Sequence, residues 1–218
     1  MHIGFLGGTG MEARGLALRW AAAGASVILG SRSLEMAAAS AESCNEILGA
    51  SLIRGMSNRE MLAASEIILL TVPYGQAVDA IESCRLLLTH NHIIVDVTVP
   101  MVFREGHAEF VEQSGLSNAE IIAGHLPDGV PLVTAFKTIP AAILTDLQKT
   151  LDCDVFVCGD CETARQKVIQ AAAAIPSLRP LDGGPLKNAR TLELMTVLAA
   201  ELNRRYKKKG ARYRIVGI

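Results

Sequence analysis

A glycine-rich turn after the first apolar segment constrains the fold of this chain more than any other feature. Residues 2–6 form a short apolar run, which favours a buried parallel strand. The turn that follows, Gly8-Thr9-Gly10-Met11-Glu12-Ala13, fits the pattern G-x-G-x-x-G/A. In this pattern the first glycine allows a tight turn, the second lets the backbone approach a pyrophosphate, and the small third residue lets a helix pack on the strand. Because a strand precedes the turn and a helix pattern follows it, we favour a dinucleotide-binding βαβ unit over a plain structural turn.

Strand and helix patterns alternate along most of the chain. We expect a doubly wound, Rossmann-type α/β fold with a mostly parallel sheet and a small C-terminal helical appendage. Residues 101–129 are less regular, and we expect them to pass over the sheet edge without forming a separate domain. The expected strands are 2–6, 25–29, 51–53, 66–72, 93–99, 130–136, 154–157 and 178–181, with an edge strand at 213–216, and the expected helices are 11–23, 34–48, 58–64, 76–88, 118–123, 141–151, 162–174 and 186–206.

Charge and composition favour small molecules as ligands. The chain has 21 basic and 22 acidic residues, so it lacks the basic surface expected of a protein that binds nucleic acid or an anionic membrane. No apolar run approaches the roughly 18 residues of a membrane span, and no secretory signal is evident, so we expect a cytoplasmic protein. The odd number of cysteines argues for reduced thiols. Cys158 and Cys161 have CxxC spacing, but without a second pair we interpret them as a strand cysteine and a loop cysteine, and we expect no metal site.

The residues after the second strand indicate which dinucleotide is bound. An NAD site has Asp or Glu at this point to accept hydrogen bonds from the ribose 2′-hydroxyl, whereas this chain has Gly30-Ser31-Arg32. A guanidinium can hold a 2′-phosphate with two hydrogen bonds, and a serine hydroxyl can add another. Thr9 on the glycine turn could reach the same phosphate. The pattern predicts NADP rather than NAD.

No second constellation of catalytic type is evident in the sequence. The five histidines are spread over the chain, and none is placed with a carboxylate and a nucleophile. Asp96 is an unusual charge within an apolar strand, and either a structural hydrogen bond or a position near the ligand would explain it. The absence of a proton donor suits hydride transfer between two stacked rings, which needs mainly position and exclusion of water.

A series of motifs resembles the F420-dependent NADP reductase family. The motifs occur in the family's order over residues 3–190: LGGTG, GLALR, LGSR, LTVP, VTVP, KTIPAA, VCGD and RPLDGGPLKNAR. The resemblance implies an oxidoreductase that transfers a hydride between NADP(H) and the 5-deazaflavin coenzyme F420 by direct ring stacking. No side chain is then a chemical catalyst. It also implies a homodimer, an NADP-binding domain at residues 1–180, and a helical segment at 181–218 that completes the acceptor pocket.

The resemblance also assigns residues to the two cofactors. Thr9, Ser31 and Arg32 would hold the 2′-phosphate, and Gly8 and Gly10 would line the pyrophosphate. The segment Thr71, Val72 and Pro73 would run beside the nicotinamide, whose carboxamide would be fixed by main-chain groups of the TIPA segment. The deazaflavin would lie between the loop after the fifth strand and the turn at 184–186. The remaining cofactor-binding residues are therefore Thr138, Ile139, Pro140 and Ala141 of the TIPA segment, with Val99, Pro100 and Leu186 around the deazaflavin.

The chain departs from the family pattern at two positions near the nucleotide, and two alternative functions stay open because other NADPH-dependent reductases share this N-terminal layout. Glu12 brings a negative charge toward the phosphate end of the turn, and Ser33 stands where a second arginine can occur. One alternative is an NADPH-dependent reductase of another acceptor, namely a flavin, a metal chelate or an imine. Another is a non-catalytic NADP-sensing module, which the motif RPLDGGPLKNAR disfavours because a sensor would not need an acceptor wall.

Overall fold

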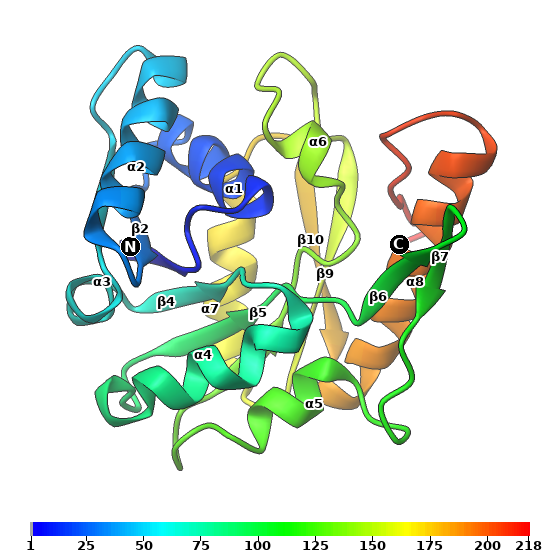
Figure 1. Ribbon diagram of the computed structural model, residues 1–218. Coiled ribbons are helices and arrows are strands. Elements are labelled where there is room, and N and C mark those ends of the chain that lie inside the picture. The colour runs from blue at the N-terminus through cyan, green and yellow to red at the C-terminus, as the bar shows by residue number, and fades with distance from the viewer. Residues whose placement is uncertain (1) are drawn as a thin grey trace.

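An eight-stranded sheet organises the protein, as the computed structural model of residues 2–218 shows (Figure 1). Its strand order is β3-β2-β1-β4-β5-β8-β9-β10, and neighbouring strands are parallel except β8 and β9. The chain leaves β1 toward β2 and β3 and later returns to β4 on the other side of β1. The gap between the carboxyl ends of β1 and β4 is therefore the switch point at which doubly wound sheets bind their ligands. The predicted Rossmann-type fold is confirmed.

Most elements lie where the sequence pattern predicts them, within a few residues. The strands are β1 (His2–Leu6), β2 (Ser26–Ser31), β3 (Ile53–Ser57), β4 (Ile67–Leu70), β5 (Ile93–Asp96), β6 (Met101–Arg104), β7 (His107–Phe110), β8 (Leu132–Thr134), β9 (Cys153–Gly159) and β10 (Leu178–Gly184). The α-helices are α1 (Met11–Ala22), α2 (Leu34–Leu48), α3 (Asn58–Ala64), α4 (Ala77–Cys84), α5 (Asn118–Ala123), α6 (Ala141–Leu144), α7 (Glu162–Ala173) and α8 (Ala189–Arg205).

Two apolar clusters fill the space on either side of the sheet, because successive strand residues point to opposite faces. In β1, Phe5 packs into the cluster under α1, α2, α6 and α7, whereas Leu6 packs into the cluster under α3, α4, α5 and the start of α8. Trp20 of α1 is the largest side chain of the first cluster. Its ring lies edge-on to Phe5 and Phe136, and its indole N–H donates to the carbonyl of Ala171 at 2.7 Å.

The irregular residues 101–129 form the ribbon β6–β7 and helix α5, and the ribbon packs beside α8 (Figure 1). The backbone N–H of Ala108 in β7 donates to the Glu201 carboxylate of α8 at 2.6 Å. The predicted division of the chain at residue 180 stays a prediction, although β10 runs across that point. Within residues 2–218, no helix has both the length and the apolar character needed to cross a membrane.

Several predicted elements are shorter than expected, and one is absent. β4 and β5 end at Leu70 and Asp96, so the residues after them form loops at the carboxyl edge of the sheet. The helix predicted over 141–151 ends at Leu144 because the buried Arg19 guanidinium binds the carbonyls of the last turn and of the loop beyond it, at 2.5–3.1 Å. The predicted tail strand at 213–216 is not a strand, although the Asp154 N–H does donate to the carbonyl of Tyr213 at 2.9 Å.

Candidate active site

The glycine turn opens onto a cleft of about 430 Å³ at the carboxyl ends of β1, β2 and β4. We call it the glycine-turn cleft. Its walls come from the loops after these three strands and from one side of α4. The residues that line it are Leu6, Gly7, Thr9, Gly10, Ser31, Arg32, Asn58, Thr71, Val72, Pro73, Gln76, Asp79, Ala80 and Ser83.

The glycines of the turn have different local roles from those that the motif predicts. Gly7, which the pattern did not single out, has a left-handed φ of 91°, so this residue makes the tight turn. Gly8 does not line the cleft. It packs against β2, where a Cβ atom would lie 2.8 Å from the Cβ of Leu29, and its N–H donates to the Gly30 carbonyl at 2.9 Å. Gly8 therefore fixes the turn against the sheet, while Gly7 and Gly10 border the cleft.

The start of α1 is free to bind an anion. Gly10 is the N-cap residue and has no side chain to accept hydrogen bonds from the first N–H groups of the helix. A Cβ at Gly10 would meet only the Thr71 carbonyl oxygen, 3.7 Å away, and the Gly7 carbonyl oxygen, 3.9 Å away. Ala13 is fully buried, as the motif requires for close packing of the helix on the strand. Helix N–H groups that face a cleft in this way are a phosphate-binding arrangement.

The predicted 2′-phosphate residues, Thr9, Ser31 and Arg32, lie together in the cleft. The Ser31 hydroxyl accepts a hydrogen bond from the N–H of Ser33 at 3.2 Å, and Ser33 in turn caps α2. Arg32 is exposed, and within residues 2–218 its guanidinium forms no ion pair. A guanidinium at this position remains available to a ligand.

Asn58 is a polar residue of the cleft that the sequence analysis missed. Its Oδ1 atom is buried and has no hydrogen-bond partner among residues 2–218. Since a buried acceptor without a donor costs about 1–3 kcal/mol, the atom is available for a ligand hydroxyl or amine. Asn58 begins α3, and the preceding Ser57 caps this helix with a capping box to Glu60.

Thr71 joins the ends of β4 and β1. Its hydroxyl donates to the carbonyls of Leu6 at 3.1 Å and Gly7 at 3.3 Å, and its N–H donates to Leu6 at 3.0 Å. The next two residues, Val72 and Pro73, border the glycine-turn cleft and also a second cavity. The two hollows therefore meet at the loop after β4.

The second cavity has a volume of about 490 Å³ and lies between the sheet edge and α8. We call it the α8 cavity. The TIPA segment and Val99 line it, as predicted, and small residues of α8 form the opposite wall. Its remaining lining residues are Glu12, Val72, Pro73, Tyr74, Val97, Thr98, Met101, Lys137, Thr196, Ala199, Ala200, Asn203 and Ala211.

Two residues predicted for the deazaflavin pocket do not line the α8 cavity. Pro100 is buried behind Val99 in the chain, and its carbonyl accepts the N–H of Val111 at 2.7 Å. Leu186 is 6% exposed and packs into the apolar cluster that contains Ile122 and Leu132. The turn at 184–186 lies at the end of β10, before α8 begins. The C-terminal segment thus reaches the cavity through the middle of α8 and not through this turn.

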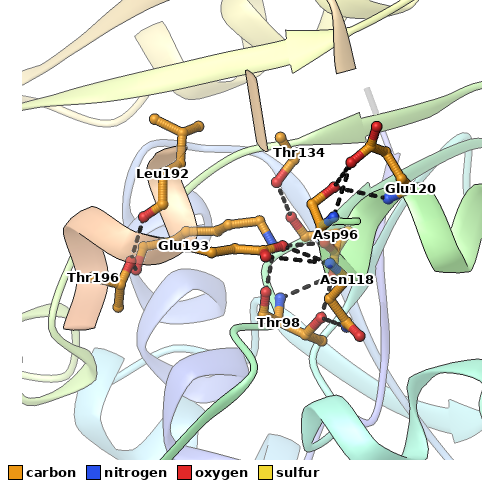
Figure 2. Close-up of polar contacts among 10 residues, drawn as sticks. Asp96, Thr98, Asn118, Glu120, Thr134, Leu192, Glu193 and Thr196 are labelled. Carbon is orange, nitrogen blue, oxygen red and sulfur yellow. Dashed lines mark hydrogen bonds and ion pairs between the residues drawn. The ribbon is translucent and has the colours of Figure 1, made fainter. Parts of the chain in front are cut away.

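A buried ionic network lies behind the cavity (Figure 2). The Lys137 ammonium donates to Asp96 Oδ2 at 2.6 Å, to Glu193 Oε1 at 3.2 Å and to the Thr98 carbonyl, and its side chain is fully buried, as are both carboxylates. Burial raises the pKa of Glu193, and the nearby Lys137 ammonium acts in the opposite direction. The Asn118 N–H also donates to Glu193, at 3.0 Å. Asp96 is therefore bound within a structural network that joins β5, α5 and α8.

The two cysteines of the CxxC motif do not meet a metal-ligand set. Cys158 is buried in β9, and Cys161 is exposed at the N-cap of α7, which agrees with the interpretation as a strand cysteine and a loop cysteine. Over residues 2–218, His, Cys, Asp and Glu side chains form no cluster of three or more that could hold a metal ion.

The sheet order, the glycine turn and the uncapped start of α1 define a Rossmann-type dinucleotide-binding protein. Residues 2–100 match the family model described as "NADP oxidoreductase coenzyme F420-dependent". The chain is 34% identical to the F420-dependent NADP reductase of Methanocaldococcus jannaschii, with 100% of this chain and 99% of that protein covered. It is 33% identical to the F420-dependent NADP reductase of Methanothermobacter thermautotrophicus, over 100% and 96% of the two chains. The chain belongs to the F420-dependent NADP reductase family.

The fold also agrees with a solved structure. A protein from Arthrobacter sp. FB24 superposes with a TM-score of 0.82 over 99% of both chains, at 20% sequence identity. At this identity the likeness concerns the fold, and it includes the C-terminal region that carries α8.

Proposed function

We propose that this protein is an oxidoreductase that transfers a hydride between NADP(H) and coenzyme F420. The observation that carries the proposal is the meeting of two hollows at Val72 and Pro73, one suited to a dinucleotide and one to a flat ring. Two rings can approach each other only where their binding sites share a wall. The full-length relatives in two methanogens, both named F420-dependent NADP reductases, support the same pair of substrates.

The glycine-turn cleft has the groups that NADP requires. The N–H groups at the start of α1 would hold the pyrophosphate next to Gly10, and Gly8 would keep the turn close to it. Thr9, Ser31 and Arg32 would bind the 2′-phosphate. The unpartnered Oδ1 of Asn58 adds an acceptor for a donor group of the nucleotide.

The α8 cavity has the groups that the nicotinamide and the deazaflavin require. Thr71, Val72 and Pro73 lead from the first hollow into the second, where main-chain groups of Thr138, Ile139, Pro140 and Ala141 would fix the carboxamide. Val99 would pack against the flat deazaflavin, with Ala199 and Ala200 of α8 in place of the turn at 184–186 as the far wall. Pro100 would act through the position of Val99, and we propose no contact for Leu186.

The hydride moves between the two bound rings, and this chemistry is supplied by the substrates. The task of the protein is to hold both rings in one geometry and to exclude water, which lowers the barrier without a side-chain acid or base. Apolar walls such as Val97 and Val99 suit this task. The alternatives of a flavin, metal-chelate or imine reductase, or of a sensing module, are less favoured because the family relatives match the chain over its whole length.

The proposal is tested by mixing the purified protein with NADPH and oxidised F420 and following the F420 absorbance, with riboflavin phosphate as a parallel acceptor. We expect F420 to be bleached and riboflavin phosphate to react slowly or not at all. An Ala200→Phe variant should raise KM for F420 at least several-fold, because the ring would enter the α8 cavity, whereas Ala174→Phe on the exposed end of α7 should not. Turnover of riboflavin phosphate without F420 bleaching would exclude the proposed substrate.

We further propose that the protein is a cytoplasmic homodimer. The cytoplasmic location is supported by the cysteines, since four of the five free cysteines are buried, as expected for a chain that functions in a reducing compartment.

The dimer is supported by exposed apolar residues on α8. Leu194 and Leu198 expose 45% and 53% of their surface on neighbouring turns of the helix, and Tyr206 exposes 66% just after it. An exposed apolar row of this kind is typical of a contact between subunits.

A further inference from the structure

Glu12 occupies an unexpected place for an acidic side chain. It lies in the first turn of α1 and lines the α8 cavity beside Val72 and Pro73, where the two hollows meet. The side chain is half-buried. A carboxylate here faces the region proposed for the nicotinamide end of the nucleotide, since the TIPA segment lines the same cavity.

The Glu12 carboxyl is not engaged by the rest of the protein. Within residues 2–218 it forms no ion pair and no hydrogen bond, and it interacts with Lys137 and Asp96 only through their charges. Lys137 cannot turn toward it, because its ammonium already donates to Asp96, Glu193 and the Thr98 carbonyl. A lysine ammonium group has three N–H donors, and all three are used.

The titratable and charged residues near Glu12 lie on three sides of the cavity. Tyr74 is the titratable residue on the side of β4, and Lys137 lies on the side of β8. Asp96 and Glu193 lie behind Lys137, on β5 and α8, and together they offset its positive charge. Burial raises the pKa of Glu12 to about 8, the Lys137 ammonium lowers it in part, and the Asp96 carboxylate adds to the rise. At pH 7 the carboxyl group is mostly protonated.

We propose that Glu12 is a specificity-determining residue that distinguishes the oxidised from the reduced nicotinamide by changing its own charge. The proposal rests on the proposed binding of NADP in the glycine-turn cleft. In its protonated form Glu12 has no charge and treats both nucleotides alike. In its ionised form it attracts the pyridinium cation of NADP⁺, a charge that the neutral dihydropyridine of NADPH lacks.

The two nucleotides differ in charge at the nicotinamide and carry the same phosphates, so the ratio of their dissociation constants isolates this interaction. Bound NADP⁺ lowers the pKa of Glu12, whereas bound NADPH does not, because only the cation stabilises the carboxylate. At a pH below the pKa of Glu12 in each of the two complexes, Glu12 is neutral in both and does not affect the ratio of the dissociation constants. As the pH rises above these two pKa values, Glu12 becomes ionised and NADP⁺ gains affinity relative to NADPH. By linkage, NADP⁺ binding near pH 8 must also release protons.

The experiment measures the dissociation constants of NADP⁺ and NADPH from pH 6 to pH 9.5 by calorimetry, without F420. We expect the ratio Kd(NADPH)/Kd(NADP⁺) to rise about tenfold over this range, which corresponds to a difference of roughly one unit in the pKa of Glu12 between the complexes. In buffers of different ionisation enthalpy, NADP⁺ binding at pH 8 should release a fraction of a proton. In Glu12→Gln the ratio should stay constant with pH and the proton release should disappear.

Arg32→Ala serves as the matched control, because its proposed contact is to the 2′-phosphate that both nucleotides share. It should weaken both ligands by the same factor and leave the pH dependence of their ratio unchanged. If Glu12→Gln instead changes both affinities equally, Glu12 acts on the phosphates and the proposal is overturned. A ratio that is independent of pH in the unaltered protein would overturn it as well. A protein that binds neither nucleotide would refute the proposed function itself.

Discussion

At the scale of single residues, Arg32 is the side chain to which we assign the preference for NADP over NAD. It follows the last residue of β2, borders the glycine-turn cleft and has no carboxylate partner within residues 2–218. A hydrogen bond to a charged group contributes about 1.5–3 kcal/mol, so loss of the guanidinium should weaken NADPH binding roughly tenfold to a hundredfold. We therefore expect Arg32→Ala to reduce NADPH affinity by this factor and NADH affinity by less than twofold, as measured by nucleotide titration.

The control for this prediction is Arg54→Ala. Arg54 is also exposed and lies on the neighbouring strand β3, but it does not line the cleft. Its loss should leave both affinities unchanged. An equal loss of NADPH and NADH affinity in Arg32→Ala would mean that Arg32 does not contact the 2′-phosphate.

At the scale of the elements, the Lys137 network fastens α8 to the sheet. Lys137 lies just after β8, Asp96 ends β5 and Glu193 belongs to the first part of α8. Figure 2 shows Asp96 and Glu193 close together. The Lys137 carbonyl also accepts the hydroxyl of Thr196 at 3.0 Å. Because α8 forms the far wall of the α8 cavity, these bonds determine the width of the cavity as well as the stability of the helix.

Removal of the cation alone should be costly, because it leaves two buried carboxylates without their partner. We expect Lys137→Met to lower the free energy of unfolding by about 3–5 kcal/mol, as measured by urea denaturation. Lys149→Met should cost less than about 1 kcal/mol, since Lys149 is exposed and pairs with Asp146 on the surface. The double variant Lys137→Met with Glu193→Gln should recover part of the loss, because one of the stranded charges is removed. A loss in Lys137→Met as small as that of Lys149→Met would contradict this account.

These elements also show how far local sequence patterns predict the structure. The alternation of strands and helices, the glycine turn and the loops after β4 and β5 follow from short-range periodicity, and the structure has them in the predicted order. The early end of α6 could not be predicted in this way, because it depends on Arg19, which is more than a hundred residues away in the chain.

The position of Leu186 could not be predicted from local patterns either. A glycine pair before a proline resembles a ligand-binding turn, but Leu186 is apolar and is drawn into the cluster between the sheet and α5. The residues that do line the cavity from the C-terminal side, such as Ala199 and Asn203, lie in an ordinary helix pattern. Contacts between residues far apart in the chain hold that helix in place, among them the pairing of Lys137 with Glu193 and the hydrogen bond from the Thr196 hydroxyl to the Lys137 carbonyl. Such long-range pairing is not visible in a single sequence.

At the scale of the whole molecule, α8 has two distinct faces, one that lines the cavity and one that exposes apolar side chains. Thr196, Ala199, Ala200 and Asn203 recur at helical spacing and line the α8 cavity. Leu194 and Leu198 also recur at this spacing but are exposed. The ribbon β6–β7 packs beside α8 (Figure 1), and Phe103 on this ribbon is 65% exposed as well. If a second copy covers these apolar side chains, it also supports the helix that closes the cavity.

The dimer prediction can be tested with Leu198→Glu, which would place a charge in the proposed contact. We expect this variant to be monomeric in sedimentation equilibrium where the unaltered protein is dimeric, because burying an unpaired carboxylate costs more than the contact gains. Leu86→Glu is the matched control, since Leu86 is 99% exposed in the turn after α4, outside α8 and the ribbon β6–β7, and should not affect association. NADPH affinity should be unchanged in both variants, whereas KM for F420 should rise in the monomer, since the wall of the α8 cavity loses its outer support. If the Leu198→Glu variant is monomeric and its KM for F420 is unchanged, the dimer contact does not support the α8 cavity. If the unaltered protein is itself monomeric, the proposed dimer is refuted.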